Sequence, residues 1–254
     1  MVVRRGAVLM AVAAMTCLVA AGCGTRQSPV AAPHHHPHHH PAVVASAPAA
    51  PTTFLVASTH GDIPGSPAPG APQNQMVPAT WYGYPTILPV INTVPSWVEV
   101  RLAQRPNGST TWVPQSDVTL SVTPFHLVLN LSTEHLVVYK DGQEIMNFPA
   151  GIGTPSDPTV TGNYFVTMTV APPDPGYGPF VLVTSAHSDS ITDWAASGDA
   201  IIAIHGPITS YDDSRIGATG AAISHGCIRL HDADLAQLSV IPAGTPLDIV
   251  SGQV

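Results

Sequence analysis

Residues 224–230 read SHGCIRL and place one cysteine, Cys227, between His225 and Arg229. A cysteine thiol with an ordinary pKa is only slightly ionised at neutral pH, and the thiolate is the reactive form. Nearby cationic side chains favour that form, and Gly226 lets the backbone come close to a molecule that the sulfur attacks. The stretch therefore predicts a reactive cysteine.

The N-terminus has the pattern of an export signal. Two arginines precede an apolar run that is too short to span a bilayer, and small residues lead to Cys23. This arrangement resembles the lipobox of bacterial lipoproteins, so we expect a signal peptide over residues 1–22 and a lipid on Cys23. Cys17 would be removed with the signal, which leaves Cys227 without a partner for a disulfide. An unpaired thiol in an exported protein indicates a reactive group.

The charge balance narrows the choice of partners. The chain has 8 Lys and Arg against 16 Asp and Glu, a formal net charge of −8. Nucleic acid is excluded as a partner, because binding to it needs a basic surface. A polybasic patch is missing from the sequence as well, so attachment to a membrane would depend on the lipid.

Residues 23–76 are dominated by Pro, Ala, Ser and His and contain few aromatic residues. Such a segment cannot bury enough apolar surface to offset its ordering entropy, which predicts a disordered tether. The tract His34–His40 within it reads HHHPHHH. It is interpreted either as a metal-binding cluster or as low-complexity sequence in a solvated linker.

Residues 77–123 predict a small β module of SH3-like size. Short runs rich in Trp, Val, Thr and Tyr are separated by Pro, and Asn107-Gly108 is a hairpin signal because both residues tolerate a positive φ. Four aromatic residues line a ligand groove or form the core, and the core is the preferred interpretation in so small a unit: Tyr82, Tyr84, Trp97 and Trp112.

Residues 124–251 predict a second, mainly β domain that is long enough for its own core. Asp141-Gly142 predicts another hairpin turn, and a short buried strand over residues 200–204 ends at His205. One short helix, capped by Asp232, and a last strand over residues 246–250 complete the pattern.

A cysteine nucleophile needs a base, and two histidines compete for that role. His225 is its neighbour in the sequence, whereas His205 ends a buried strand and is followed by a glycine. The spacing alone does not choose between them. A zinc site of His205, His225, Cys227 and His231 fits the residue types, but the spacing matches no common zinc pattern.

The sequence around these residues resembles the signature of L,D-transpeptidases. That signature has a histidine, here within Ile204-His205-Gly206, then a gap, then the SHGC of residues 224–227. Upstream, residues 151–155 (GIGTP) and 158–164 (PTVTGNY) are similar to the family's glycine-, proline- and threonine-rich segment. The resemblance covers residues 124–250 and implies a β-sandwich catalytic domain.

The resemblance also implies a reaction. Cys227 would attack the carbonyl of the L-centre of meso-diaminopimelate in a peptidoglycan stem tetrapeptide, expel D-alanine and pass the acyl group to a second stem, giving a 3→3 cross-link. His205 would carry the proton, and His225 would assist. The backbone of Gly226 would contribute to the oxyanion hole. We expect no cofactor and no bound metal, and the family likeness implies acylation of Cys227 by carbapenems.

Substrate binding is assigned less directly. Ser224 is a candidate substrate-binding residue that would also hold the turn, and Arg229 would either orient the loop or bind a carboxylate. Tyr177 and His187 are candidate cleft residues. Family members often have Ser where this chain has Gly206, so any contact that orients His205 must come from a backbone carbonyl.

Three other functions remain open. An L,D-carboxypeptidase would use the same nucleophile with water as the acceptor. A non-catalytic lipoprotein would bind metal through its histidine tract, or bind the wall through the β module. In every case we expect a lipid-anchored protein on the outer face of the cytoplasmic membrane, facing the cell wall. The sequence leaves the oligomeric state open.

Overall fold

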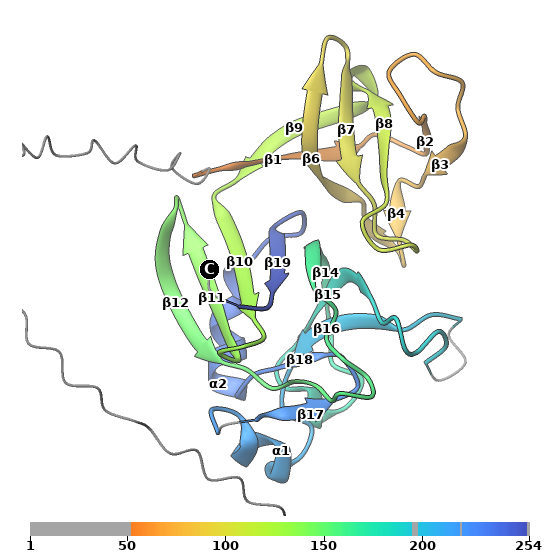
Figure 1. Cartoon of the computed structure of the whole chain (residues 1–254). Helices are drawn as coiled ribbons and strands as arrows, with labels where there is room; N and C mark the ends of the chain where they lie inside the picture. The colour runs from red at the N-terminus through yellow and green to blue at the C-terminus, as the bar shows by residue number, and fades with distance from the viewer. Residues whose placement is uncertain (1–51, 195–197, 219, 253–254) are drawn as a thin grey trace, which may run out of the picture. The chain divides into compact units, whose positions relative to one another are not determined.

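The computed structural model describes residues 52–194, 198–218 and 220–252 (Figure 1). Strands dominate this part of the chain, so the prediction of a mainly β protein is confirmed. The predicted signal peptide, the lipid attachment at Cys23 and the tract His34–His40 lie outside the described residues. Within the described residues, no helix has the length and apolar character needed to cross a membrane.

The N-terminal part forms a five-stranded antiparallel sheet in the order β8-β7-β6-β1-β9 (Figure 1). Two short hairpins, β2–β3 and β4–β5, accompany it. The bounds are β1 (Phe54–Thr59), β2 (Ile63–Gly65), β3 (Gln75–Val77), β4 (Thr80–Trp81), β5 (Tyr84–Pro85), β6 (Ile87–Val94), β7 (Trp97–Arg101), β8 (Thr110–Pro114) and β9 (Val118–Thr123).

The structure corrects the boundary of the predicted tether. Strand β1 lies inside residues 23–76, and it pairs with β6 on one side and β9 on the other. Its run FLVAST buries Val56 and Ala57 in the sheet. The average composition of the segment hid this run, because prolines and glycines surround a strand of only six residues. The β module therefore begins at Phe54 and not at residue 77.

The preferred interpretation of the four aromatic residues is also wrong. The core of the N-terminal sheet consists mainly of aliphatic side chains, including Val98, Val100 and Val113. Trp97 and Trp112 are only half-buried. Tyr82 is 69% exposed and Tyr84 is 40% exposed, so neither contributes to the core. Alternate residues of β7 and β8, mostly valines, fill the interior, since successive side chains of a strand point to opposite faces.

The C-terminal part forms one curled eight-stranded sheet in the order β12-β11-β10-β19-β14-β15-β16-β18 (Figure 1). The bounds are β10 (Phe125–Asn130), β11 (His135–Lys140), β12 (Gln143–Pro149), β14 (Gly162–Val170), β15 (Val181–His187), β16 (Ile201–His205), β18 (Ile228–Arg229) and β19 (Pro246–Val250). A separate pair joins β13 (Ile152–Gly153) to β17 (Ala222–Ser224), and the helices are α1 (Ser210–Arg215) and α2 (Asp232–Gln237).

Several local predictions are confirmed and others need correction. Asp141 and Gly142, with φ of 51° and 75°, join β11 to β12. Asp232 does not cap α2: it is the first helical residue, and His231 holds the cap position without a side-chain hydrogen bond. Gly108 has the expected positive φ of 81°, within a loop that is longer than a two-residue turn.

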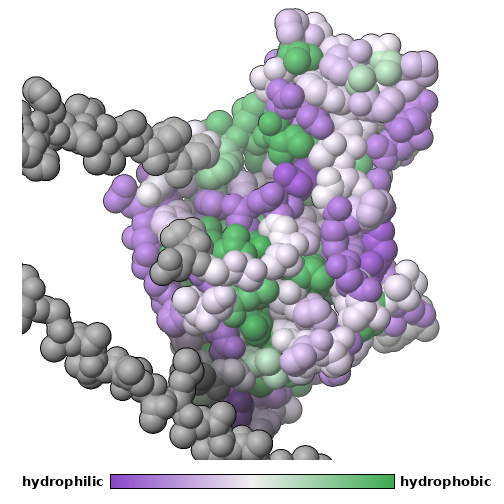
Figure 2. All heavy atoms as spheres, viewed as in Figure 1, coloured by the Kyte–Doolittle hydropathy of each residue, from purple (hydrophilic) through white to green (hydrophobic). Residues whose placement is uncertain are grey.

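A residue of the C-terminal sheet contributes to the hydrophobic core of the N-terminal sheet. Phe165 of β14 is buried in the core cluster of the N-terminal sheet, although β14 belongs to the C-terminal sheet. Only Pro124 separates β9 from β10. Figure 2 shows hydrophobic residues on the visible face in several patches, with hydrophilic residues between them. The two sheets are therefore packed against each other through a shared core residue.

Candidate active site

Cys227 lies in the short turn between β17 and β18. Strand β18 runs parallel to β16, with Ile204 opposite Ile228 and His205 opposite Arg229. This register brings the end of the His205 strand beside the cysteine turn, although the two segments are well separated in the sequence. The sheet topology thus assembles the two parts of the predicted signature.

A network beneath the sulfur fixes the turn. Gly226 adopts a φ of 113°, which favours glycine. The Thr159 hydroxyl donates to the Gly226 carbonyl at 2.8 Å, and the Ser224 hydroxyl donates to the Cys227 carbonyl. Ser224 and Thr159 are both buried. Ser224 therefore holds the turn. It is not part of the cavity wall, so its prediction as a substrate-binding residue needs correction.

A cavity of about 530 Å³ opens at the cysteine. Its walls include Tyr177, His205, His225, Cys227 and Arg229, so five of the predicted site residues line one space. The remaining walls are largely apolar. Such a cavity, with a few converging polar groups, is typical of a binding site for a small ligand or a peptide segment.

His205 is held as a neutral base. Its ring is buried, and its Nδ1 lies 2.7 Å from the Gly206 carbonyl, which accepts the Nδ1 proton and leaves Nε2 as an acceptor. The predicted backbone contact to His205 is therefore present. Burial lowers the pKa of His205 to about 4, and the Tyr177 ring packs on it at a centroid distance of 4.6 Å.

The thiol differs from the prediction. Burial raises the pKa of Cys227, although a hydrogen bond from the Ala203 backbone and the charge of Arg229 act in the opposite direction. The expectation that neighbouring cations enrich the thiolate is wrong in its net effect, because burial outweighs them. Cys227 and His205 therefore rest as a neutral thiol and a neutral imidazole, and a proton must move when the sulfur attacks.

The predicted oxyanion donor is already engaged. The Gly226 amide donates to the Ser224 hydroxyl at 3.1 Å. The Cys227 amide meets no acceptor within the described part of the chain. Of the Gly226 and Cys227 amides, that of Cys227 is the one available to a developing oxyanion.

The family model of the L,D-transpeptidase catalytic domain (YkuD) matches residues 124–249, which contain this whole site. The chain belongs to the L,D-transpeptidase catalytic domain family. Its members are acyltransferases that modify peptidoglycan.

Individual relatives are distant. The YkuD protein of Bacillus subtilis (strain 168) is 23% identical over 127 residues, which is 50% of this chain and 66% of that protein. An L,D-transpeptidase from Mycobacterium smegmatis is 16% identical with a TM-score of 0.39, over 65% of this chain and 89% of that one. The structure of LD transpeptidase LdtMt1 in complex with imipenem is 17% identical with a TM-score of 0.41, over 75% of this chain and 99% of that one.

Arg229 in this L,D-transpeptidase domain is buried and already paired. Its Nη1 lies 2.9 Å from Asp212 Oδ2 of α1, and its backbone exchanges two hydrogen bonds with Gly151. The guanidinium charge is therefore balanced within the protein. This arrangement favours the loop-orienting role of Arg229 over the binding of a substrate carboxylate.

His225 is exposed and lines the cavity beside Trp194, with the ring centroids 5.3 Å apart. His231, the remaining histidine of the zinc alternative, lies 2.6 Å from Asp213 through Nδ1. In the described residues, no group of three or more His, Cys, Asp or Glu side chains is arranged to hold a metal ion.

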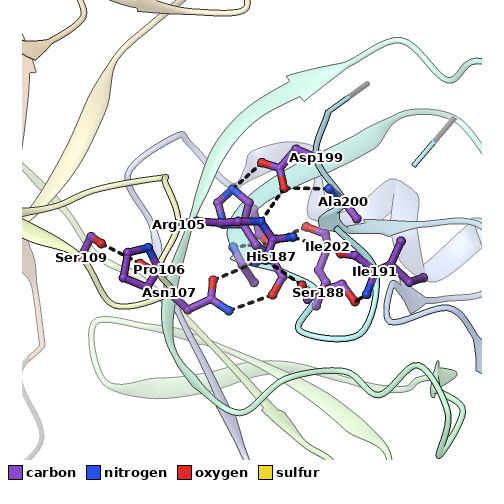
Figure 3. Close-up of polar contacts among 12 residues, drawn as sticks. Arg105, Pro106, Asn107, Ser109, His187, Ser188, Ile191, Asp199, Ala200 and Ile202 are labelled. Carbon is purple, nitrogen blue, oxygen red and sulfur yellow. Dashed lines mark hydrogen bonds and ion pairs between the residues drawn. The ribbon is translucent and has the colours of Figure 1, made fainter. Parts of the chain in front are cut away.

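His187 is not a cleft residue. It ends β15 with its side chain buried and is not part of the cavity wall. Its Nε2 lies 3.0 Å from Asp199, which also pairs with Arg105 (Figure 3). The prediction of a cleft position was wrong because a histidine near the end of a strand can point either way, and here it points into the protein.

Sequence reasoning missed several cavity residues. Trp194, Ile191 and Ile208 line the cavity but carry no local motif. Ile208 has a φ of 72°, which is uncommon for a β-branched residue and marks local strain at the cavity wall. The sequence gives no signal for such a conformation, because tertiary contacts impose it.

Proposed function

We propose that this protein is an L,D-transpeptidase that joins peptidoglycan stems through a thioester on Cys227. The observation that carries the proposal is that Cys227, in a fixed turn, lines the same cavity as His205, whose Nδ1 proton is accepted by the Gly206 carbonyl. This pair lies within the segment that matches the family.

The first half-reaction forms the acyl-enzyme. The Cys227 sulfur attacks the carbonyl carbon of the L-centre of meso-diaminopimelate while its proton passes to Nε2 of His205. The carbonyl oxygen takes the negative charge and accepts a hydrogen bond from the Cys227 amide. The carbon–nitrogen bond to D-alanine then breaks, and His205 returns the proton to the departing amine.

The second half-reaction transfers the acyl group. The side-chain amine of a second stem attacks the thioester and gives a proton to His205, which is neutral again. Breakage of the carbon–sulfur bond releases the 3→3 cross-linked product, and the proton on His205 restores the Cys227 thiol. Because both groups are neutral at rest, each half-reaction needs a proton transfer that accompanies bond formation.

The decisive test is intact-protein mass spectrometry. Incubation with a disaccharide-tetrapeptide should add the mass of the stem without D-alanine, and Cys227→Ala should abolish the adduct while leaving the unfolding midpoint unchanged. A carbapenem should label the same residue. Product masses with and without an acceptor stem separate cross-linking from simple release of D-alanine by water. A Cys227→Ala variant that still forms cross-links would overturn the mechanism.

We further propose that the protein is anchored by a lipid on Cys23 at the outer face of the cytoplasmic membrane. The support is the N-terminal sequence pattern of a charged start, an apolar run and small residues before the cysteine. Metabolic labelling with a fatty-acid analogue should mark the wild-type chain and not Cys23→Ser. Label retained on the variant would contradict the anchor.

A further inference from the structure

We propose that Tyr82 and Tyr84 form a subsite for a sugar ring of the peptidoglycan substrate, outside the peptide that reacts. The inference rests on the proposed function and adds a role for the N-terminal β module. Both tyrosines belong to the β4–β5 hairpin of that module, and both line the same cavity as Cys227 and His205. The cavity is thus built from two parts of the chain.

The hairpin tip carries unusual backbone strain. Tyr82 and Gly83 form a two-residue turn with φ of 48° and 83°. Asn, Asp and Gly are the usual residues in such turns, because a side chain on Cβ is unfavourable at positive φ. Tyr82 is 69% exposed, so burial in the core does not compensate for the strain. An exposed aromatic residue kept in a strained conformation at a cavity is a candidate for ligand binding.

The N-terminal module is also fixed against the cavity. Asn107, in the loop after β7, accepts a hydrogen bond from the His187 amide at 2.9 Å and donates one to the His187 carbonyl at 2.8 Å (Figure 3). Arg105 from the same loop donates to Asp199 at 2.9 Å and to the Ser188 carbonyl at 2.8 Å. Asp199 lines the cavity, so these contacts set the module directly against its wall.

Two hydrogen bonds also fix the base of the β4–β5 hairpin. The Ala79 amide donates to Asp62 Oδ1 at 2.7 Å, and the Thr86 amide donates to the Ala79 carbonyl at 3.0 Å. The ring of Tyr82 packs edge-on against Trp81, with a centroid distance of 5.6 Å. The tyrosines therefore occupy set positions at the cavity rim.

The charges of the cavity point to an uncharged ligand at this rim. Arg229 is paired with Asp212, and Asp199 with Arg105 and His187. A tyrosine ring offers a flat apolar face together with a phenol that hydrogen-bonds at its edge. A pyranose ring has the complementary form, with an apolar C–H face and hydroxyl groups around its rim. Since the stem peptide is attached to the glycan, binding a sugar here would add remote binding energy to the reaction of the peptide.

The test compares two substrates on the full-length chain. Tyr82→Asn combined with Tyr84→Ala should lower kcat/KM about tenfold for a disaccharide-tetrapeptide and no more than twofold for the same tetrapeptide without sugar. Asn is chosen at position 82 because it tolerates the positive φ. The matched control is Tyr211→Ala, since Tyr211 on α1 is equally exposed, at 69%, and does not line the cavity. Neither substrate should distinguish that control from the wild type.

A second measurement does not depend on turnover. The peptide-free disaccharide should bind the Cys227→Ala chain in an NMR titration, and the two tyrosine substitutions should abolish that binding. Equal losses on both substrates, or unchanged disaccharide binding, would overturn the sugar subsite. If the wild type formed no thioester but the disaccharide still bound through the tyrosines, the proposed reaction would fail and the subsite would stand.

Discussion

Asn107 contacts the backbone of His187 from both sides. Its Oδ1 accepts from the His187 amide at 2.9 Å, and its Nδ2 donates to the His187 carbonyl at 2.8 Å (Figure 3). One side chain thus satisfies both backbone groups of a buried residue, as a neighbouring strand would. The contact joins the loop after β7 to the end of β15.

Replacing this amide should destabilise the protein. Asn107→Ala leaves two backbone groups of His187 without their partner, and we expect a loss of about 2 kcal/mol in the free energy of unfolding. Urea denaturation measures it. Asn147→Ala is the matched control, because Asn147 is exposed on β12, and its loss should stay within about 0.5 kcal/mol. Equal losses in the two variants would show that the Asn107 contact contributes no more to stability than the hydrogen bonds of an exposed asparagine.

The ion pair between Arg229 and Asp212 gives a second prediction. Its side chains are only 9% and 16% exposed. Asp212→Asn leaves the guanidinium buried without a counter-charge, which should cost about 3 kcal/mol in the free energy of unfolding. Asp213→Asn is the control on the same helix, since the pair of Asp213 with His231 is more exposed, at 48% and 35%. Denaturant unfolding should show a loss below about 1 kcal/mol for Asp213→Asn; a similar loss in both would contradict the role of burial.

Local features of the fold were predictable. A two-residue hairpin turn requires a positive φ at both positions. Asp141 and Gly142 both tolerate that conformation, so the dipeptide alone predicts the hairpin. The last strand follows from a run of alternating residues and has the predicted bounds, Pro246–Val250. Strand β1 was not predictable from composition, because its apolar run is short and its partners, β6 and β9, lie far along the chain.

The site shows the same division between local and long-range effects. The SHGC motif and the glycine after His205 identify the region of the candidate nucleophile and the contact that fixes the imidazole tautomer. The direction in which the pKa of the Cys227 thiol shifts was not predictable, since it depends on how deeply the fold buries this side chain. Asn107 and His187 meet across 80 positions of sequence, and neither residue carries a signal for the other.

Gly206 allows a close approach of three segments. A Cβ atom at this position would lie 2.5 Å from Asp232 Oδ1, 2.8 Å from the Gly178 nitrogen and 2.9 Å from the Tyr177 carbonyl carbon. Two of these atoms belong to the backbone, so the chain would have to shift around His205. A serine at this position would need a different backbone arrangement.

Gly206→Ala should therefore impair both stability and acylation. We expect a loss of about 1–3 kcal/mol in the free energy of unfolding, the usual cost of overpacking, and at least tenfold slower labelling of Cys227 by a carbapenem. Gly61→Ala is the control, since an added Cβ there meets nothing within 4 Å. Unfolding and labelling rates close to the wild type in Gly206→Ala would show that the neighbouring segments move aside without consequence.

The pKa of His205 predicts how stability depends on pH. Burial lowers this pKa from 6.5 to about 4 in the folded protein, so the unfolded chain binds more protons between these two values. The contribution of His205 to the free energy of unfolding is therefore fully present above pH 6.5 and is lost as the pH drops towards 4. Between pH 7.5 and pH 5 the contribution of His205 corresponds to a loss of about 2 kcal/mol. Burial also lowers the pKa of His187, which adds a loss of the same sign.

His205→Gln isolates the contribution of His205. Urea unfolding measures how much the free energy of unfolding falls between pH 7.5 and pH 5. This fall should be about 2 kcal/mol smaller for the variant than for the wild type, because glutamine binds no proton in either the folded or the unfolded state. The comparison uses the change with pH in each protein, so any fixed cost of the substitution cancels. In the folded wild type the imidazole stays neutral at pH 5, so labelling of Cys227 by a carbapenem should not decline through pH 6.5 as it would with an ordinary histidine base. A steep decline of labelling near pH 6.5, together with equal stability losses in the two proteins, would show that the imidazole is not buried as a neutral base.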